Sequence, residues 1–431
     1  MSSTFVAAPE SASSPELEVA RSWTHRMAGA LTHRNFRVLW FAALASTIGT
    51  WMQQFAQSLL VKSLSGPNSS FYLSLDVFLG QLPIILLMLI GGVIADRLDR
   101  RRLLTGSQLV QAFSAFSLAA LVFTGHVEIW HILALSFISG CGQAFGGPAY
   151  QSMIPSLVPR RDLPNAIALN SSQFNLSRLL GPVSGVAVAL SLGMAWCFTL
   201  NGISFFFVVA ALAVLHIPER KIPERRPLVE ELKGGLNYVR NQRAVLTLTA
   251  LVFLAGFLAM PISTFLPIFA SDVFGSGGVE GAQGRLAILM AAQALGAIAG
   301  ALIIGALSRM KMGRVLFLLL LGLGGLIAAF SISRIWLLSC ALLFLCGVVT
   351  MMVFSISFSL VQLTVPDALR GRVVSIYMVA LRGGWPLGSL VAGSLAVSFS
   401  APTVMAINGL LLFLVAAGLL ISGRGRSLRE I

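Results

Sequence analysis

The positive charge of this chain falls almost entirely on alternate segments between its apolar stretches. Twelve such stretches occur, and most reach the length of about 20 residues that a helix needs to cross the hydrocarbon core. With the N-terminus assigned to the cytoplasm, 25 of the 30 lysine and arginine residues lie in cytoplasmic segments. The outer loops hold only Lys62, Arg285 and Arg334. By the positive-inside rule, this asymmetry indicates a multi-pass membrane protein with both termini in the cytoplasm.

Composition agrees with a membrane protein and explains the excess of positive charge. Hydrophobic residues make up 56% of the chain and charged residues 11%, which excludes an ordinary soluble domain. The net charge of +14 would suggest nucleic acid as a partner of a soluble protein. Here the charges are spread over the cytoplasmic segments next to membrane exits, where they set topology and contact anionic headgroups. We therefore expect the lipid bilayer, and no nucleic acid, as a partner.

These patterns predict an all-α polytopic membrane protein with twelve transmembrane helices in two pseudo-symmetric six-helix bundles. The longest internal polar segment contains three prolines and seven basic residues, and it separates six apolar stretches from six. After Pro227, apolar residues recur at helical spacing, which predicts a short amphipathic helix at the cytoplasmic surface. The expected parts are a disordered cytoplasmic tail (1–35), the N-terminal bundle (36–216), the linker with its short helix (217–243), the C-terminal bundle (244–422) and a cytoplasmic tail (423–431).

The two halves repeat each other in sequence. The segment Gln151–Pro155 resembles Gln362–Pro366, which lies 211 residues later. The pair Leu180-Gly181 returns as Leu387-Gly388 at an offset of 207 residues. A transporter built from two related halves, with its substrate site between them, predicts such a repeat.

The second cytoplasmic loop contains a motif. It has a glycine, three residues, an Asp-Arg pair and then a basic cluster, at Gly92, Asp96, Arg97, Arg100 and Arg101. This loop resembles the signature loop of the major facilitator superfamily. Asp99 stands where that family usually has glycine.

The resemblance implies a gate for this loop. Asp96 would contact the cytoplasmic end of the eleventh span, at Gly371 and Arg372, because a carboxylate is stabilised at a helix N-terminus and beside arginine. A contact that forms in only one of two transport states biases the equilibrium between them. The alternative is that the basic residues act only on topology.

A second motif lies in the fifth apolar stretch. Gly181, Pro182 and Gly185 form a Gly-Pro-x-x-Gly pattern that resembles the motif of antiporter members of the superfamily. The segments 148–182 and 366–388 resemble one branch, which contains the enterobactin exporter and the transmembrane secretion effectors. The resemblance covers nearly the whole chain after residue 34 and implies export of a small compound.

Two arginines lie deep in apolar sequence. A charge at the centre of a span costs about 2.5–3.5 kcal/mol on insertion scales, so Arg178 and Arg382 are candidates for a functional role. Either one is a hydrogen-bond donor between helices or a contact for substrate or an anion, and the sequence leaves both alternatives open.

Neutral amides supply most of the remaining polarity inside the spans. In the first span, Gln53, Gln54 and Gln57 share one helical face, which favours a wall of a cavity because amides in lipid are costly without partners. A cavity of amides and aromatic side chains suits an amphipathic solute. The other candidate cavity residues are Gln143, Asn170, Gln173, Gln293 and Gln362.

Two acids are candidates for proton coupling. Asp76 lies about one and a half turns into the second span from the outer side, and Asp272 lies near the outer end of the seventh. Each is either a protonatable coupling group or a hydrated residue at the headgroup boundary.

Several function classes lack their motifs here. The sequence has no Walker-type phosphate loop, no His-Glu-x-x-His and no metal-like spacing among its four cysteines. We therefore expect no enzyme activity, no cofactor and no metal. The favoured function is a secondary active exporter, driven by protons, for a small amphipathic compound. It would act as a monomer in a bacterial-type inner membrane. The alternatives are an importer with the same fold and a non-transporting receptor or scaffold.

Overall fold

The computed structural model describes residues 29–97, 99–215, 228–275, 278–306 and 312–421. Within these ranges the side chains of 88–97, 228–233, 278–280, 305–306 and 368 are outside the description. The helices of the first half are η1 (Gly29–Thr32), α2 (Arg34–Ser65), η2 (Gly66–Asn68), α3 (Ser69–Arg97), α4 (Arg100–Phe123), α5 (Ile129–Leu157), η3 (Arg160–Asp162), α6 (Leu163–Ser191) and α7 (Met194–Val214). Those that follow are α8 (Leu228–Asn241), α9 (Arg243–Ala259), α10 (Pro261–Ile268), η4 (Phe269–Val273), α11 (Gly278–Ala306), α12 (Met312–Ile332), α13 (Trp336–Thr364), α14 (Asp367–Phe399) and α15 (Ala401–Ile421).

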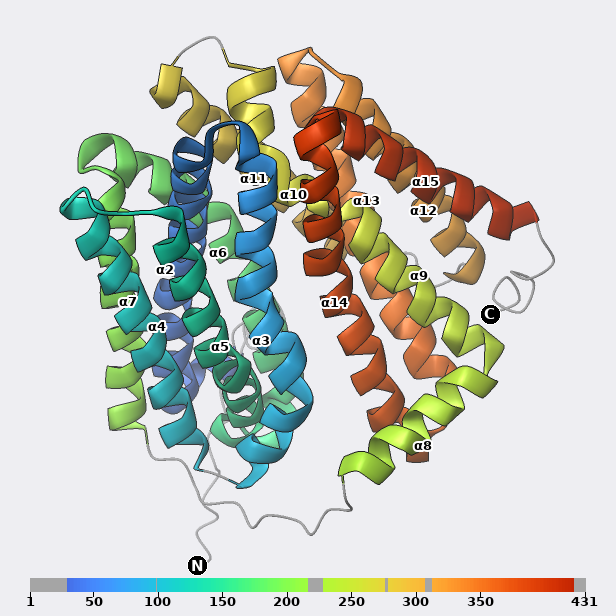
Figure 1. Ribbon diagram of the computed structural model, residues 1–431. Helices are drawn as coiled ribbons and strands as arrows, with labels where there is room; N and C mark the ends of the chain where they lie inside the picture. The colour runs from blue at the N-terminus through green and yellow to red at the C-terminus, as the bar shows by residue number, and fades with distance from the viewer. Residues whose placement is uncertain (1–28, 98, 216–227, 276–277, 307–311, 422–431) are drawn as a thin grey trace, which may run out of the picture.

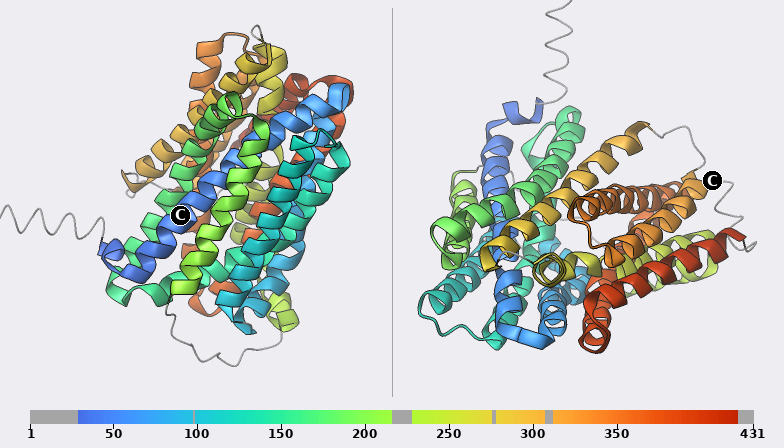
Figure 2. Two further views of the ribbon diagram at one scale, coloured as in Figure 1. Left: turned by 90° about the vertical axis from the view of Figure 1, so that its left-hand side faces the viewer. Right: turned by 90° about the horizontal axis from the view of Figure 1, so that it is seen from above.

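The long helices form two bundles that lie side by side (Figures 1 and 2). In the first bundle α2 packs against α6, α3 against α5, and α4 against α7. The second bundle repeats this pattern, since α9 packs against α14, α11 against α13, and α12 against α15. The prediction of an all-α membrane protein with two related bundles is confirmed.

Nine segments of the described chain are long and apolar enough to cross a membrane. The first of them, residues 34–87, contains α2 and most of α3, so these segments account for ten of the expected spans. The other two spans are α6 and α14, whose polar side chains lower their hydropathy. Arg178 lies in α6 and Arg382 lies in α14.

The seventh span is broken beside the centre of the molecule. Its pieces α9 and α10 meet at Met260, and Pro261 is the first residue of α10. Proline has no N–H, so Pro261 cannot donate to the carbonyl of Phe257 as a helix requires. The span then ends in η4, a π-helical segment that contains Asp272. Breaks and π-helical turns of this kind are common where membrane helices border a site.

Glycines allow the same close helix approaches in both bundles. A Cβ atom at Gly181 would overlap Trp51 of α2, and one at Gly388 would overlap Phe257 of α9. Both glycines come from the repeated Leu-Gly pair of the sequence. Small residues of this kind let membrane helices approach closely where a larger side chain would prevent it.

The two ends of the molecule differ in how the bundles approach each other. We call the end that carries residues 66–68 and Asp272 the far end, and the end that carries η1 and α8 the linker end. The ribbons of the two bundles lie closest at the far end and are more widely separated at the linker end (Figure 1).

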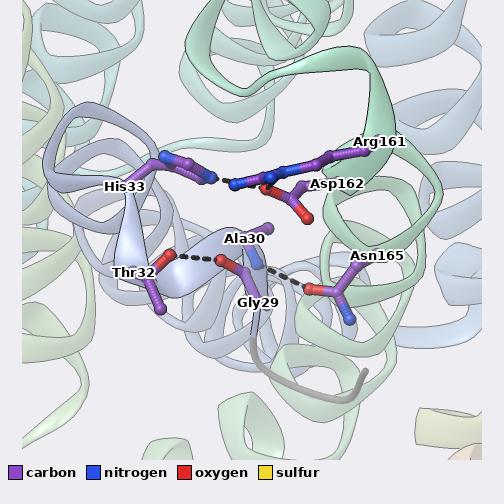
Figure 3. Close-up of polar contacts among 7 residues, drawn as sticks. All are labelled: Gly29, Ala30, Thr32, His33, Arg161, Asp162 and Asn165. Carbon is purple, nitrogen blue, oxygen red and sulfur yellow. Dashed lines mark hydrogen bonds and ion pairs between the residues drawn. The ribbon is translucent and has the colours of Figure 1, made fainter. Parts of the chain in front are cut away.

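The segment before the first span is ordered from residue 29 onward, which differs from the disordered tail expected over 1–35. The amide of Ala30 donates to Oδ1 of Asn165 at 2.8 Å, and His33 Nε2 lies 2.7 Å from Oδ2 of Asp162 (Figure 3). Ala30 is fully buried. So short a segment has no apolar periodicity, and its partners lie 129 and 135 residues later, in η3 and at the start of α6. The rest of that tail, 1–28, and the expected tail 423–431 lie outside the described residues.

Candidate functional site

A cavity of about 410 Å³ lies between the two bundles. The first bundle lines it with side chains of α2, α3, α4, α5, α6 and α7, and the second with side chains of α10, α11, α13 and α14. Among the described residues, Asp76 and Arg178 are the charged side chains of its wall. The remaining wall combines neutral amides and hydroxyls with aromatic, leucine and methionine side chains.

Asp76 is held by hydrogen bonds from two other helices. Gln57 Nε2 on α2 lies 3.0 and 2.8 Å from the two carboxylate oxygens, and the hydroxyl of Ser136 on α5 donates to Oδ1 at 2.5 Å. Gln57 Nε2 also lies 2.9 Å from Ser136 Oγ. These contacts place the carboxyl group inside the cavity. Its role as a protonatable coupling group or as a hydrated residue stays a prediction.

A chain of side-chain amides continues from this acid. Gln53 Nε2 donates to Oε1 of Gln57 at 3.4 Å. Asn201 Nδ2, on α7, donates to Oε1 of Gln53 at 2.6 Å. The chain therefore joins α7, α2 and α3 along the wall of the cavity.

Arg178 links the two bundles at the cavity. Its Nη2 donates to Oε1 of Gln293 on α11 at 3.1 Å, and its guanidinium lies 5.7 Å from the centre of the Trp51 ring. The same Gln293 oxygen accepts from the hydroxyl of Ser263 on α10 at 3.1 Å. All the partners of Arg178 in the described part of the chain are neutral. Arg178 therefore donates a hydrogen bond between helices and also faces the cavity, while a contact with substrate or an anion stays a prediction.

The far end is joined by an ion pair between the bundles. Lys62 Nζ at the end of α2 lies 3.0 Å from Oδ2 of Asp272 in η4. The Asp272 side chain is 51% exposed, so solvent weakens this pair. Beside it, a Cβ atom at Gly393 of α14 would overlap Ser74 of α3, which shows that these two helices also meet here.

The structure brings together some of the predicted site residues and not others. Gln53, Gln54, Gln57, Asp76, Gln143, Arg178 and Gln293 all line the cavity. Asn170, Gln173, Gln362, Arg382 and Asp272 are described but are not part of its wall. Gln173 is buried and bonds to Thr47 Oγ1 at 2.8 Å, so its amide serves helix packing. Arg382 is exposed on α14.

The signature loop is described only in part. The side chains of Asp96 and Arg97, and the surroundings of Gly92, lie outside the description. The gate contact of Asp96 therefore stays a prediction. Asp99 caps α4, since its Oδ1 accepts from the amide of Arg101 at 2.9 Å. Asp99 therefore has a structural role as the N-cap of α4.

The basic residues of the motifs contact helix ends at the linker end. Arg100 donates to the carbonyl of Ser152 at 3.0 Å, and Arg101 donates to that of Ala213 at 2.9 Å. In the second bundle Arg372 lies beside α8, where a Cβ atom at Gly234 would be 3.3 Å from its Nη1. Its neighbour Gly371 is exposed.

The antiporter-like motif lies within α6. Gly181 and Gly185 face α2, where added Cβ atoms would overlap Trp51 and Phe55, and Pro182 is buried. In this structure the motif therefore serves the close approach of α6 to α2.

Several wall residues were not singled out from the sequence. Ser136 donates to Asp76, Asn201 donates to Gln53, and Trp51 and Trp385 supply aromatic surface. Asn201 and Trp385 carry a signal that was present in the sequence, a polar or amphipathic side chain inside an apolar stretch. Ser136 carried none, because serine is common in membrane helices.

A family model described as transmembrane secretion effector matches residues 27–425. The chain belongs to this family. This family is of the major facilitator type, and the resemblance stated from the sequence is confirmed.

Curated relatives are efflux proteins at low identity. The chain is 26% identical over 279 residues to macrolide efflux protein A of Streptococcus pyogenes, covering 63% of this chain and 66% of that protein. It is 28% identical to the multidrug efflux pump Tap of Mycolicibacterium fortuitum, covering 83% and 88%. It is 23% identical to the enterobactin exporter EntS of Citrobacter koseri, covering 93% and 94%. The chain thus spans just under two thirds of the macrolide efflux protein.

Solved structures support the fold. The nucleoside transporter NupG superposes with a TM-score of 0.65 at 16% identity, covering 90% of this chain and 100% of that one. A D-xylose-proton symporter superposes with a TM-score of 0.67 at 15% identity, covering 88% and 97%. At these identities the likeness concerns the fold alone.

Proposed function

We propose that this protein is a proton-driven exporter that moves a small amphipathic compound outward by alternating access. The observation that carries the proposal is Asp76, an acid on the wall of the cavity between the bundles, held by Gln57 and Ser136. Ionisable groups that face a cavity inside the membrane are characteristic of proton pathways.

The direction of transport rests on charge and on relatives. Most of the basic residues belong to segments on the side of the linker end, which supports the proposal that this side and both termini are cytoplasmic. With the bundles joined at the far end by Lys62 and Asp272, this is a state that loads cargo from the cytoplasm. Efflux is also the function in the names of the curated relatives. We propose that the protein works as a monomer in a bacterial-type inner membrane.

The cavity wall supports an amphipathic cargo. Apolar and aromatic side chains such as Met290, Phe354 and Trp385 offer surface for an apolar body, and the amides opposite offer donors and acceptors for its polar groups. Arg178 supplies a donor with a fixed geometry.

The test is uptake of the lipophilic dye Hoechst 33342 by inside-out vesicles that contain the protein, with an imposed proton gradient. We expect uptake that collapses when an uncoupler is added, and no such uptake in vesicles without the protein. Gradient-dependent movement in the opposite direction would show an importer. Folded, inserted protein that moves no dye in either direction would contradict the proposal for cargo of this class.

A further inference from the structure

We propose that Gln57, Gln53 and Asn201 form an amide relay that reverses when Asp76 takes up a proton and so changes the hydrogen-bonding character of the cargo-facing wall. The inference rests on the proposed function, in which Asp76 carries the coupling proton. The three amides would then be positioning residues, which act on transport through the acid and through the groups that they present to cargo.

The hydrogen bonds of the relay all point in one direction. Asn201 donates to Gln53, Gln53 donates to Gln57, and Gln57 donates to both oxygens of Asp76. An ionised carboxylate only accepts hydrogen bonds, so this direction matches an ionised Asp76. Aligned bonds of this kind polarise and strengthen one another in a low-dielectric interior.

Protonation of Asp76 makes the opposite direction available. One carboxyl oxygen then becomes an O–H donor that needs an acceptor, while the other oxygen can still accept. If the Gln57 amide turns over, its oxygen accepts from Asp76 and its N–H group faces Gln53. Gln53 must then turn as well, because its own N–H would otherwise meet that of Gln57.

The reversal can end at Asn201 without leaving a buried group unpaired. Oδ1 of Asn201 accepts from the hydroxyl of Ser204 at 3.2 Å, and Ser204 also donates to the carbonyl of Asn201 at 2.7 Å. After reversal Oδ1 accepts from Gln53, while Ser204 keeps the carbonyl as its acceptor.

Reversal changes what the cargo meets. Gln53 and Gln57 both line the cavity, so turning their amides exchanges donors for acceptors on its wall. A cargo whose polar groups fit one arrangement fits the other less well. Proton and cargo binding are then linked through the wall, without direct contact between cargo and Asp76.

Other charged groups are not placed to replace this link. Within the described chain, Arg178 on α6 is the other charged residue of the cavity wall, and it bonds to Gln293 of the opposite bundle. On the helices packed against α3, Lys62 pairs with Asp272 at the far end, while His131 of α5 and Arg382 of α14 do not line the cavity.

The test is an infrared titration of purified protein in detergent, without cargo and without a gradient. The carboxyl band of Asp76 is assigned by its loss in Asp76→Asn. Gln57→Leu removes two hydrogen bonds to the carboxylate. We expect it to raise the pH at which the band is half-titrated, its midpoint, by about one pH unit or more. Gln53→Leu, which does not touch Asp76, should raise the midpoint by a smaller amount.

Gln54→Leu is the matched control, because Gln54 lies next to Gln53 on the same helix and the same cavity wall but outside the relay. We expect its midpoint to equal that of the wild type. Three results would each overturn the relay. They are an unchanged midpoint in Gln53→Leu, a midpoint shift in Gln54→Leu as large as that in Gln53→Leu, and the absence of a titrating band from Asp76. If Gln57→Leu does not fold, Gln57→Met takes its place. The midpoint of Gln53→Leu by itself still tests whether the relay exists.

The result is independent of the proposed transport activity. If the midpoints shift as expected but vesicles show no gradient-dependent dye uptake, the relay stands and the proposed function fails. If uptake is seen but Gln53→Leu titrates as the wild type does, the function stands and the relay fails.

Discussion

The two bundles share their packing but place different chemistry at equivalent positions of the cavity. The equivalence follows from matching glycine contacts. A Cβ atom at Gly140 would overlap the carbonyl of Gly80, and one at Gly347 would overlap that of Gln293. Together with the contacts of Gly181 and Gly388, these two contacts show which residues of the first bundle correspond to which residues of the second. The corresponding pairs near the cavity are Gln57 and Ser263, Asp76 and Leu289, Ser136 and Leu343, and Arg178 and Trp385.

The first member of each pair is the more polar one. The second bundle has two fully buried leucines where the first has Asp76 and Ser136. Trp385 stands where the first bundle has Arg178, and it uses its ring N–H to bond to Thr264 at 3.2 Å. The glycine contacts occur in both halves, whereas at these corresponding positions the acid and the arginine occur only in the first half. We infer that proton coupling belongs to the first bundle and that the second supplies mainly apolar wall.

The largest effect is expected at Asp76. Asp76→Asn keeps the shape of the side chain but removes the ionisable group, so gradient-driven dye uptake in vesicles should fall by about 5–150-fold, the usual range of coupling between sites. Asp272→Asn is the control, because that acid lies in the second bundle and outside the cavity. It should keep the dependence of uptake on the gradient. A loss of that dependence in Asp272→Asn with normal behaviour of Asp76→Asn would reverse the assignment.

The shared packing predicts equal effects in the two halves. Gly181→Ala and Gly388→Ala each place a Cβ atom against the backbone or Cβ of a neighbouring helix, so each should destabilise the protein by about 1–3 kcal/mol. Thermal unfolding in detergent measures this. The controls Gly147→Ala and Gly383→Ala have open space around the new atom and should be neutral or stabilising. A marked loss at only one of Gly181 and Gly388 would show that the halves pack differently.

The ion pair at the far end should have a smaller effect. Lys62→Ala removes the pair with Asp272, and because the acid is half exposed the loss is about 0–1 kcal/mol. We expect a modest rise in opening at this end, measured by labelling of a cysteine at position 54 with a maleimide added from the outer side, in protein whose native cysteines are replaced. The swap Lys62→Asp with Asp272→Lys should restore the wild-type rate. Equal labelling rates in the wild type and in Lys62→Ala would show that this ion pair does not limit opening at the far end.

The smallest effect is expected at the linker end, at the contact between His33 and Asp162. The hydrogen bond from His33 and the nearby Arg161 charge lower the pKa of Asp162, despite its partial burial. A lowered pKa stabilises the folded contact above the ordinary carboxyl range near pH 4, and that contribution is lost as pH falls through the lowered value. Hydrogen exchange at Ala30, corrected for its intrinsic rate, should therefore rise below pH 4. Asp162→Asn should show no such step, and a step that persists in it would exclude this carboxyl as the cause.

The fold could be predicted from the sequence, because apolar stretches and alternating charge are local properties that the bilayer imposes directly. The amide face of α2 could also be predicted, since Gln53, Gln54 and Gln57 repeat at helical spacing. The sequence gives the depth of Asp76 along its span, but it does not show whether the side chain points into the cavity. That direction depends on how the helix is rotated in the bundle. Ser136, which holds this acid, lies 60 residues away on another span.

The same limit explains the polar residues that do not reach the cavity. Gln173 and Arg382 lie in polar stretches like that of Arg178, yet one packs against α2 and the other is exposed on α14. Polarity inside a span shows that a partner is needed, but it does not show whether the partner is a helix, water or cargo.

The most direct test of the account is proton release when cargo binds. Purified protein in weakly buffered detergent is mixed with Hoechst 33342, and the pH change is compared with that of Asp76→Asn and Asp272→Asn. We predict that the wild type and Asp272→Asn release protons on binding and that Asp76→Asn binds the dye without release. Equal proton release from Asp76→Asn would contradict the assignment of coupling to the first bundle.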